Sequence, residues 1–127
     1  AGDLLTDYET VLHGGDYNVC PTDIDVYDPV VWVNDALCRP ESRAHLRTVV
    51  HLGYIDAFRA RHPDEPHRYS FWDYQGRAWP QDHGLRIDHL LLNPQAADRL
   101  VECDIDRGPR GLDKASDHTP VWCELDL

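Results

Sequence analysis

The chain has 127 residues, 42% of them hydrophobic, and a formal net charge of −11 at pH 7. This length and composition fit one globular domain with a real core and exclude a disordered chain. The apolar runs fall well short of the eighteen or so residues that a membrane span requires, and the N-terminus shows no export signal. We therefore expect a cytoplasmic protein with no membrane partner, whose four cysteines are reduced: Cys20, Cys38, Cys103 and Cys123.

The acidic net charge leaves two classes of function open. By itself it argues against a nucleic-acid binder, because contacts to phosphates need Lys and Arg side chains. A metal-dependent nuclease must also concentrate carboxylates, however, so the sign of the charge does not decide between the classes. The cysteines and histidines have no zinc-finger spacing, which argues against a structural zinc site.

The first half of the chain is expected to contain a helix end, a strand, a loop and a helix. Residues 4–9 have the character of a helix end, residues 10–14 that of a short strand, and residues 21–29 that of a loop. Apolar residues recur near helical spacing between Leu46 and Leu52. This periodicity predicts a helix over residues 40–52, with Gly53 as its C-terminal cap.

The second half is expected to be richer in strands. Four runs are apolar or alternate as strands do: residues 69–72, 86–92, 101–105 and 120–125. A turn over residues 81–84 and a short helix over residues 94–100 separate them. Strands with intervening helices and short loops imply an α/β fold with a mixed sheet.

Polar residues follow the first predicted strand. In the segment Gly15-Asp16-Tyr17-Asn18, the alternation of an extended chain places Asp16 and Asn18 on the same side. A carboxylate and an amide on one face can hold a metal-bound water and a phosphate oxygen. The alternative is an Asx turn at the end of a strand.

Two further acidic residues stand in notable places. Asp117 precedes His118 in a loop, where the carboxylate could ligate Mg²⁺ and the imidazole could donate to a phosphoryl oxygen; an ordinary loop is the alternative. Asp88 lies in the apolar run from Ile87 to Leu92, where a carboxylate needs a partner. That partner is either a histidine, which Asp88 would orient for catalysis, or an arginine in a structural salt bridge.

The aromatic segment from Tyr69 to Tyr74 allows two interpretations. Exposed rings could stack on bases or on the faces of sugars, whereas buried rings would pack in the core. The remaining histidines show no ligand spacing and are expected at the surface or in packing roles: His13, His45, His51, His62, His67, His83 and His89.

Taken together and in this order, these segments resemble the motifs of the exonuclease III family, which has the endonuclease/exonuclease/phosphatase fold. The matching segments are Gly15 to Asn18 with Pro21 to Asp23, Phe71 to Tyr74, Gly84 to Asp88, and Ser116 to Val121. The resemblance covers essentially the whole chain. It implies the C-terminal half of a four-layer α/β sandwich, with a mixed, mostly antiparallel sheet flanked by helices.

The resemblance also implies site residues. The catalytic residues would be Asp16, Asn18, Asp88 and His118. The metal ligands would be Asp117, Asp16 and Asn18, and the metal would be Mg²⁺, with Mn²⁺ as the alternative. The walls of a pocket for a base-less sugar would be Phe71, Leu85 and Ile87.

The roles that the resemblance implies divide the reaction among these side chains. His118, oriented by Asp88, would contact the scissile phosphate and stabilise the developing charge. Asp16 would position or deprotonate the attacking water, and Asn18 would hold the phosphate beside it. Metal, activated water and donors to the nonbridging oxygens are what phosphodiester hydrolysis needs.

The implied activity is hydrolysis of DNA phosphodiesters in DNA repair: 3′ to 5′ exonuclease on duplexes, cleavage at abasic sites, and removal of 3′ phosphates. The implied partners are duplex DNA and the N-terminal half of the same domain, which carries a glutamate ligand of the metal; the full-length protein would be a monomer. Residues 1–127 are then expected to be the C-terminal part of one domain, with little activity alone. The chain contains no methionine, and so no initiator methionine, which fits this expectation.

Two other functions stay open from the residues. The chain could be a non-catalytic half-domain that acts as a binding or assembly module. It could also be a related phosphoesterase that acts on RNA or on small phosphorylated molecules.

Overall fold

The structure is a computed structural model and describes residues 10–32 and 35–126. The helix end expected over residues 4–9 lies outside the described residues. The elements in chain order are β1 (Leu12–Asp16), η1 (Asp23–Asp25), α2 (Pro29–Trp32), α3 (Pro40–His51), β2 (Ile55–Asp56), α4 (Ala57–Arg61), β3 (Asp88–Leu92), α5 (Pro94–Asp98), β4 (Leu100–Ile105), η2 (Gly108–Gly111) and β5 (Val121–Leu125).

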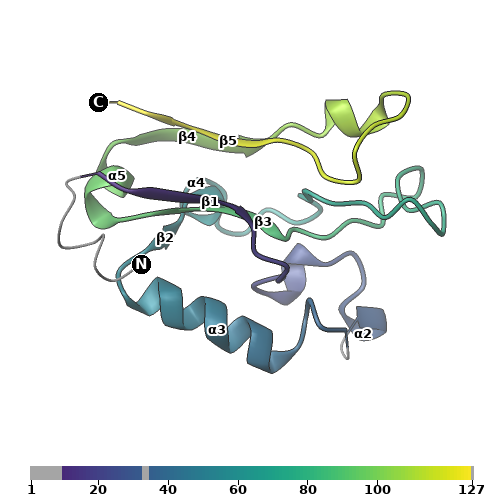
Figure 1. The fold of residues 1–127 in the computed structure, drawn as a ribbon, viewed down its shortest axis with the longest axis horizontal. Helices are drawn as coiled ribbons and strands as arrows, with labels where there is room; N and C mark the ends of the chain where they lie inside the picture. The colour runs from purple at the N-terminus through teal and green to yellow at the C-terminus, as the bar shows by residue number, and fades with distance from the viewer. Residues whose placement is uncertain (1–9, 33–34, 127) are drawn as a thin grey trace.

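The strands form two antiparallel sheets. The larger sheet has the order β1-β3-β2, and β4 pairs with β5 in a separate two-stranded sheet. Figure 1 shows α3 on one side of the larger sheet and the β4–β5 pair on the other. The expected α/β class is confirmed, and each strand pair in residues 10–32 and 35–126 is antiparallel.

The two faces of β3 bury different cores, because successive side chains of a strand point to opposite faces. Leu91 packs with Leu46 of α3 on one face. Leu92 packs on the other face with Phe58 of α4 and Cys103 of β4. β3 therefore lies at the centre of the fold, buried from both sides. None of the helices in the described part of the chain is long and apolar enough to cross a membrane.

Most of the expected elements are present. The helix expected over residues 40–52 is confirmed as α3, and Gly53 follows it with a φ of 113° that favours glycine. The strands expected over residues 10–14, 86–92, 101–105 and 120–125 correspond to β1, β3, β4 and β5.

Residues 69–72 differ from the expectation of a strand. Only Phe71 forms bridges there, one with Leu85 and one with His118. Its neighbours Tyr69 and Trp72 are buried in a small core of their own, formed by the loops. The aromatic run is therefore a packed connection between two other segments, and its apolar character reflects that burial.

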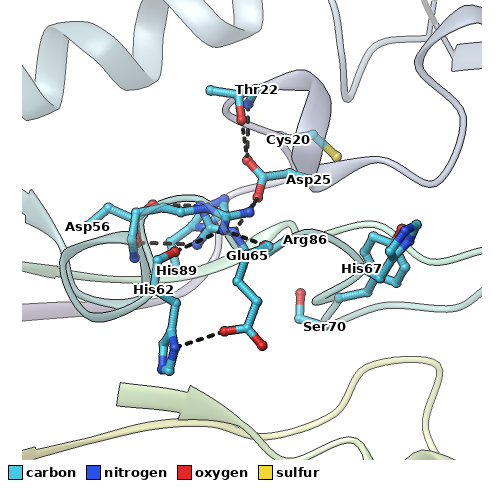
Figure 2. Close-up of polar contacts among 12 residues, drawn as sticks. Cys20, Thr22, Asp25, Asp56, His62, Glu65, His67, Ser70, Arg86 and His89 are labelled. Carbon is cyan, nitrogen blue, oxygen red and sulfur yellow. Dashed lines mark hydrogen bonds and ion pairs between the residues drawn. The ribbon is translucent and has the colours of Figure 1, made fainter. Parts of the chain in front are cut away.

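A buried arginine joins three segments that are distant in the sequence. The Arg86 side chain is 1% exposed, and it donates to Asp25 through Nε and to Asp56 through Nη2, each at 2.7 Å. Figure 2 shows Thr22 and Arg86 reaching the carboxylate of Asp25 from different sides. Asp25 also pairs with Arg59 of α4. The network connects η1, β2 and α4 to the residues that lead into β3.

Burial and charge act against each other in this network. Burial raises the pKa values of Asp25 and Asp56, but the charge and hydrogen bonds of Arg86 outweigh it, so that both pKa values lie below the ordinary range. Both carboxylates are therefore ionised at neutral pH. A buried carboxylate in this state depends on the guanidinium that faces it.

His89 completes the network as a neutral group. Its Nε2 donates to the carbonyl of Val19 at 2.8 Å, which leaves Nδ1 to accept from Arg86 Nη1 at 3.2 Å. Burial, followed by the charge of Arg86, lowers the pKa of His89 from its ordinary 6.5. The packing role expected for this histidine is confirmed by its burial.

Replacement of Arg86 should destabilise the fold strongly. Arg86→Met leaves the carboxylates of Asp25 and Asp56 buried without their shared partner, and we expect the free energy of unfolding to fall by about 3–5 kcal/mol. Urea denaturation measures this change. The control is Arg61→Met, whose exposed pair with Glu102 spans 3.6 Å and should contribute less than about 1 kcal/mol.

His89 should make the stability depend on pH. A histidine whose pKa is lowered by folding contributes stability above its ordinary 6.5 that is lost as the pH falls through it. The free energy of unfolding of the native chain, relative to His89→Gln, should therefore decrease between about pH 7.5 and about pH 5.5. A difference that stays constant over this range would show that His89 does not remain neutral on folding.

Candidate active site

Three chain segments meet at one end of the larger sheet. Asp16 is the last residue of β1 and lies opposite Asp88, the first residue of β3. His118 belongs to the loop before β5 and is held there by its bridge with Phe71. In Figure 1 this end of the sheet is the one from which the long loops before β3 and before β5 extend. The fold thus brings together acidic and imidazole groups that come from three parts of the sequence.

His118 is oriented by Asp88. Its Nδ1 lies 2.8 Å from Asp88 Oδ2, and because the carboxylate is the acceptor, Nδ1 carries the proton. Nε2 then faces Asp16 Oδ2 at 3.7 Å and Asp117 Oδ1 at 4.0 Å. Of the two partners considered for Asp88 from the sequence, the structure contains the histidine; the nearby Arg86 pairs with Asp25 and Asp56 instead.

The surrounding carboxylates favour the charged form of this imidazole. Partial burial lowers the pKa of His118, but the hydrogen bond and charge of Asp88, followed by the charges of Asp16 and Asp117, outweigh it. The pKa therefore lies above the ordinary 6.5. An imidazolium at this position is a hydrogen-bond donor, through Nε2, to an anion that enters the site.

Asp16 and Asn18 form a tight turn at the end of β1. The backbone N–H of Asn18 donates to Asp16 Oδ1 at 2.8 Å, and Asn18 has a φ of 52°, in the left-handed region that asparagine tolerates. With its amide nitrogen turned toward Asp16, the Asn18 side chain donates to both carboxylate oxygens at 3.2 Å. The Asx turn considered from the sequence is present, and it places the two side chains together.

The donor set suits a hard cation. Ligand atoms of Asp16, Asp88 and His118 lie within 4.8 Å of one another, and an oxygen of Asp117 lies 4.0 Å from His118 Nε2. Carboxylate oxygens are the ligands that Mg²⁺ and Ca²⁺ prefer. The group whose ligand atoms lie together contains Asp16 and Asp88 with His118 and does not include Asp117, whose oxygen is near His118 Nε2.

The three expected pocket residues differ in their exposure. Leu85 and Ile87 are 1% and 2% exposed and belong to a core cluster. Phe71 is half-buried against this cluster, and its ring centroid lies 5.1 Å from that of His118. A cavity of about 260 Å³ opens beside them, lined by Phe71 and Leu85 together with Tyr27, Trp32, Asp73, Gln75, Gly76, Ala78 and His83. The structure thus brings Phe71 and Leu85 to an open cavity and buries Ile87.

One further polar residue, Ser70, hydrogen-bonds to the backbone of Asp88. Ser70 is fully buried, and its Oγ accepts from the backbone N–H of Asp88 at 3.1 Å. Its contact with Asp88 was not predicted from the sequence. The signal was a single hydroxyl between Tyr69 and Phe71 in an aromatic run, where a buried polar group needs a partner.

Comparisons with known proteins agree with this arrangement. The sequence profile described as the Endonuclease/Exonuclease/phosphatase family matches residues 2–118. Exodeoxyribonuclease III of Haemophilus influenzae is 33% identical over 121 residues, which cover 91% of this chain and 45% of that protein.

Solved structures extend the likeness to the fold. A structure of the 3′ phosphatase NExo from Neisseria, bound to a product DNA hairpin, superposes with a TM-score of 0.95 and 34% identity over 99% of this chain and 49% of that one. An AP endonuclease from Archaeoglobus fulgidus superposes with a TM-score of 0.90 and 33% identity, over 98% of this chain and 49% of that one.

The chain spans about half the length of the relatives it matches. The match of the family profile extends from before β1 to His118, and so includes the residues that meet at the end of the sheet. The chain therefore belongs to the endonuclease/exonuclease/phosphatase family, in its exonuclease III branch.

Proposed function

We propose that the protein to which this chain belongs hydrolyses DNA phosphodiesters in repair, as a 3′ to 5′ exonuclease, abasic-site endonuclease and 3′-phosphatase. The observation that carries the proposal is the position of His118, held by Asp88 at 2.8 Å with Nε2 at 3.7 Å from Asp16 and 4.0 Å from Asp117. The names of the similar proteins support DNA as the substrate, because they include an exodeoxyribonuclease, an AP endonuclease and a phosphatase bound to a DNA hairpin.

The proposed cofactor is Mg²⁺, with Mn²⁺ as the alternative. Asp16 and Asp117 would hold the ion through carboxylate oxygens, and Asn18 would act from beside Asp16, with which its amide is in contact. When bound, the ion would supply positive charge that offsets the charge of the phosphate. The acidic side chains at the site would then serve to bind the cation. A net charge of −11 would therefore be compatible with binding DNA.

His118 would act as the donor to the reacting phosphate. In its protonated form, favoured by the three nearby carboxylates, Nε2 donates to a nonbridging oxygen and stabilises the negative charge that develops there. Asp88 holds the ring in this orientation through Nδ1. A donor that is oriented before the reaction needs no rearrangement when the charge develops.

Asp16 would act on the nucleophile. Its exposed carboxylate, 3.7 Å from His118 Nε2, can position a water molecule and accept its proton. Asn18 fixes the carboxylate and would contact the phosphate beside it. The roles of Asp16 and His118 are then complementary, because one accepts a proton and the other donates a hydrogen bond across the same phosphate.

Substrate selection would occur at the aromatic side of His118. Phe71 and Leu85 line an open cavity, and the Phe71 ring lies 5.1 Å from that of His118. There they would contact the sugar of the nucleotide at the scissile bond. Ile87, buried behind them, would support this wall. An apolar wall fits a sugar that lacks its base better than it fits a charged group.

We also propose that the catalytic unit includes a segment equivalent to the N-terminal half of the relatives, since this chain corresponds to about half their length. In this proposal residues 1–127 are the C-terminal part of the domain, and the other half supplies a glutamate to the metal. The complete protein would be a cytoplasmic monomer that binds duplex DNA.

The charge of Asp88 should control the titration of His118. Asp88→Asn removes the largest influence that raises the pKa of His118, so we expect this pKa to fall toward its ordinary 6.5. Asp16→Asn should lower the pKa by less. Titration of the imidazole by NMR measures both changes. Asp64→Asn removes an exposed carboxylate that is not among the charges acting on His118; it is the control and should leave the titration unchanged.

The proposed activity requires both halves of the domain and His118. When this chain is mixed with the N-terminal half of the Haemophilus influenzae enzyme, we expect Mg²⁺-dependent cleavage of an abasic-site duplex that neither half gives alone. His118→Ala should reduce kcat by about 10²–10³, the usual effect of removing a donor to a developing anion.

His51→Ala is the matched control, since His51 is exposed at the end of α3. Full activity of the His118→Ala protein would contradict the role of the imidazole. Cleavage by this chain without the other half would contradict the proposed division of the domain. Reconstitution without any phosphodiesterase activity would favour a binding or assembly module.

A further inference from the structure

Ser70 is a buried residue that hydrogen-bonds both to the segment that carries Asp88 and to the loop that carries His118. Its residue exposure is 0%, and Figure 2 places its side chain beside the segment that carries Arg86. Its Oγ accepts hydrogen bonds from the backbone N–H groups of Ile87 and Asp88, both at 3.1 Å. A serine oxygen has two lone pairs, and both are used here on consecutive amides.

The backbone of the same residue contacts the loop that carries His118. The carbonyl of Ser70 accepts from the N–H of Thr119 at 2.8 Å. Two residues further along, the N–H of Trp72 donates to the carbonyl of Asp117 at 2.9 Å. The segment around Ser70 is thus bonded on one side to the start of β3 and on the other side to the residues on both sides of His118.

The hydroxyl is needed as a hydrogen-bond acceptor for the backbone at the start of β3. The paired residues of β1 and β3 end at Asp16 and Asp88, and beyond them the N–H of Tyr17 donates to the carbonyl of Ile87 at 3.0 Å. The N–H groups of Ile87 and Asp88 donate to Ser70 Oγ instead. Buried N–H groups need an acceptor, and the Ser70 hydroxyl provides one for both. Its loss would let this part of the backbone move or admit water.

We infer that Ser70 is a positioning residue that holds Asp88 in line with His118. The bond between Asp88 Oδ2 and His118 Nδ1 is 2.8 Å long, and bonds of this kind weaken steeply with misalignment. Ser70 holds the backbone of Asp88 through its hydroxyl. It holds the loop of His118 through its carbonyl, which accepts from Thr119. The inference rests on the proposed function only in that the pair is taken to be catalytic.

Ser70→Ala tests the inference, because it removes the hydroxyl and keeps the backbone contacts with Leu85 and Thr119. We expect faster hydrogen exchange at the amides of Ile87 and Asp88, and unchanged exchange in α3. At a pH that leaves His118 neutral, its ring nitrogens should shift from the Nδ1–H tautomer toward a mixture with Nε2–H, as read from their ¹⁵N chemical shifts. Ser70→Thr, which retains a hydroxyl, should restore both signals.

Ser42→Ala is the matched control. It removes another serine hydroxyl, which donates to the carbonyl of Ala36 at 2.7 Å, and should alter neither signal. Both measurements are made on this chain without DNA or metal, so they stand apart from any failure of nuclease activity. Three results would overturn the inference: an unchanged tautomer in Ser70→Ala, an equal loss in Ser70→Thr, or complete unfolding of Ser70→Ala, which would show that the hydroxyl maintains the fold and not the pair.

Discussion

Arg86 lies between the carboxylates of Asp25 and Asp56; Arg86 and Asp25 are fully buried, and Asp56 is mostly so. The three groups come from different parts of the chain, and none of them is acceptable there without the others, because an isolated buried charge is strongly unfavourable. The network therefore permits one arrangement of η1, β2 and the entry to β3. This arrangement sets the position of Asp88, two residues after the arginine, and through it the rest of the site.

The balance of charges at the site differs from that in this network. At the network Arg86 and Arg59 neutralise the carboxylates of Asp25 and Asp56. At the end of the sheet three carboxylates surround one half-exposed imidazole. The excess negative charge at the end of the sheet can be balanced by a protonated His118 and by a bound cation. An acidic protein could bind a polyanion in this way, since in the proposed site the cation and the imidazolium would contact the phosphate directly, whereas the overall charge acts at longer range.

Local patterns predicted the elements whose residues interact with near neighbours. The periodicity of α3, the alternation in β4 and β5 and the turn at Asp16 and Asn18 are properties of short segments, and the structure agrees with them. The apolar run that becomes β3 was equally clear. The ordered motifs also indicated which distant segments share a site, because Asp16, Asp88 and His118 do lie together.

The features that could not be predicted depend on contacts between distant residues. Phe71 has the sequence character of a strand residue, but its two bridging partners come from separate loops, which leaves isolated bridges. The partners of Arg86 lie in η1 and β2, and no local pattern connects them to it. Ser70 acts on amides that follow it by seventeen and eighteen residues, so its role becomes visible only once the fold is known.

The location of the bound cation is the most direct test of this account. Mn²⁺ added to the isotopically labelled chain broadens the NMR signals of nearby residues, and no activity is needed for the measurement. We expect the strongest broadening at Asp16, Asp117 and His118, and its loss in Asp16→Asn. Broadening centred instead on the carboxylates of Glu65 and Glu102, which lie beside His62, would contradict the assignment of the site.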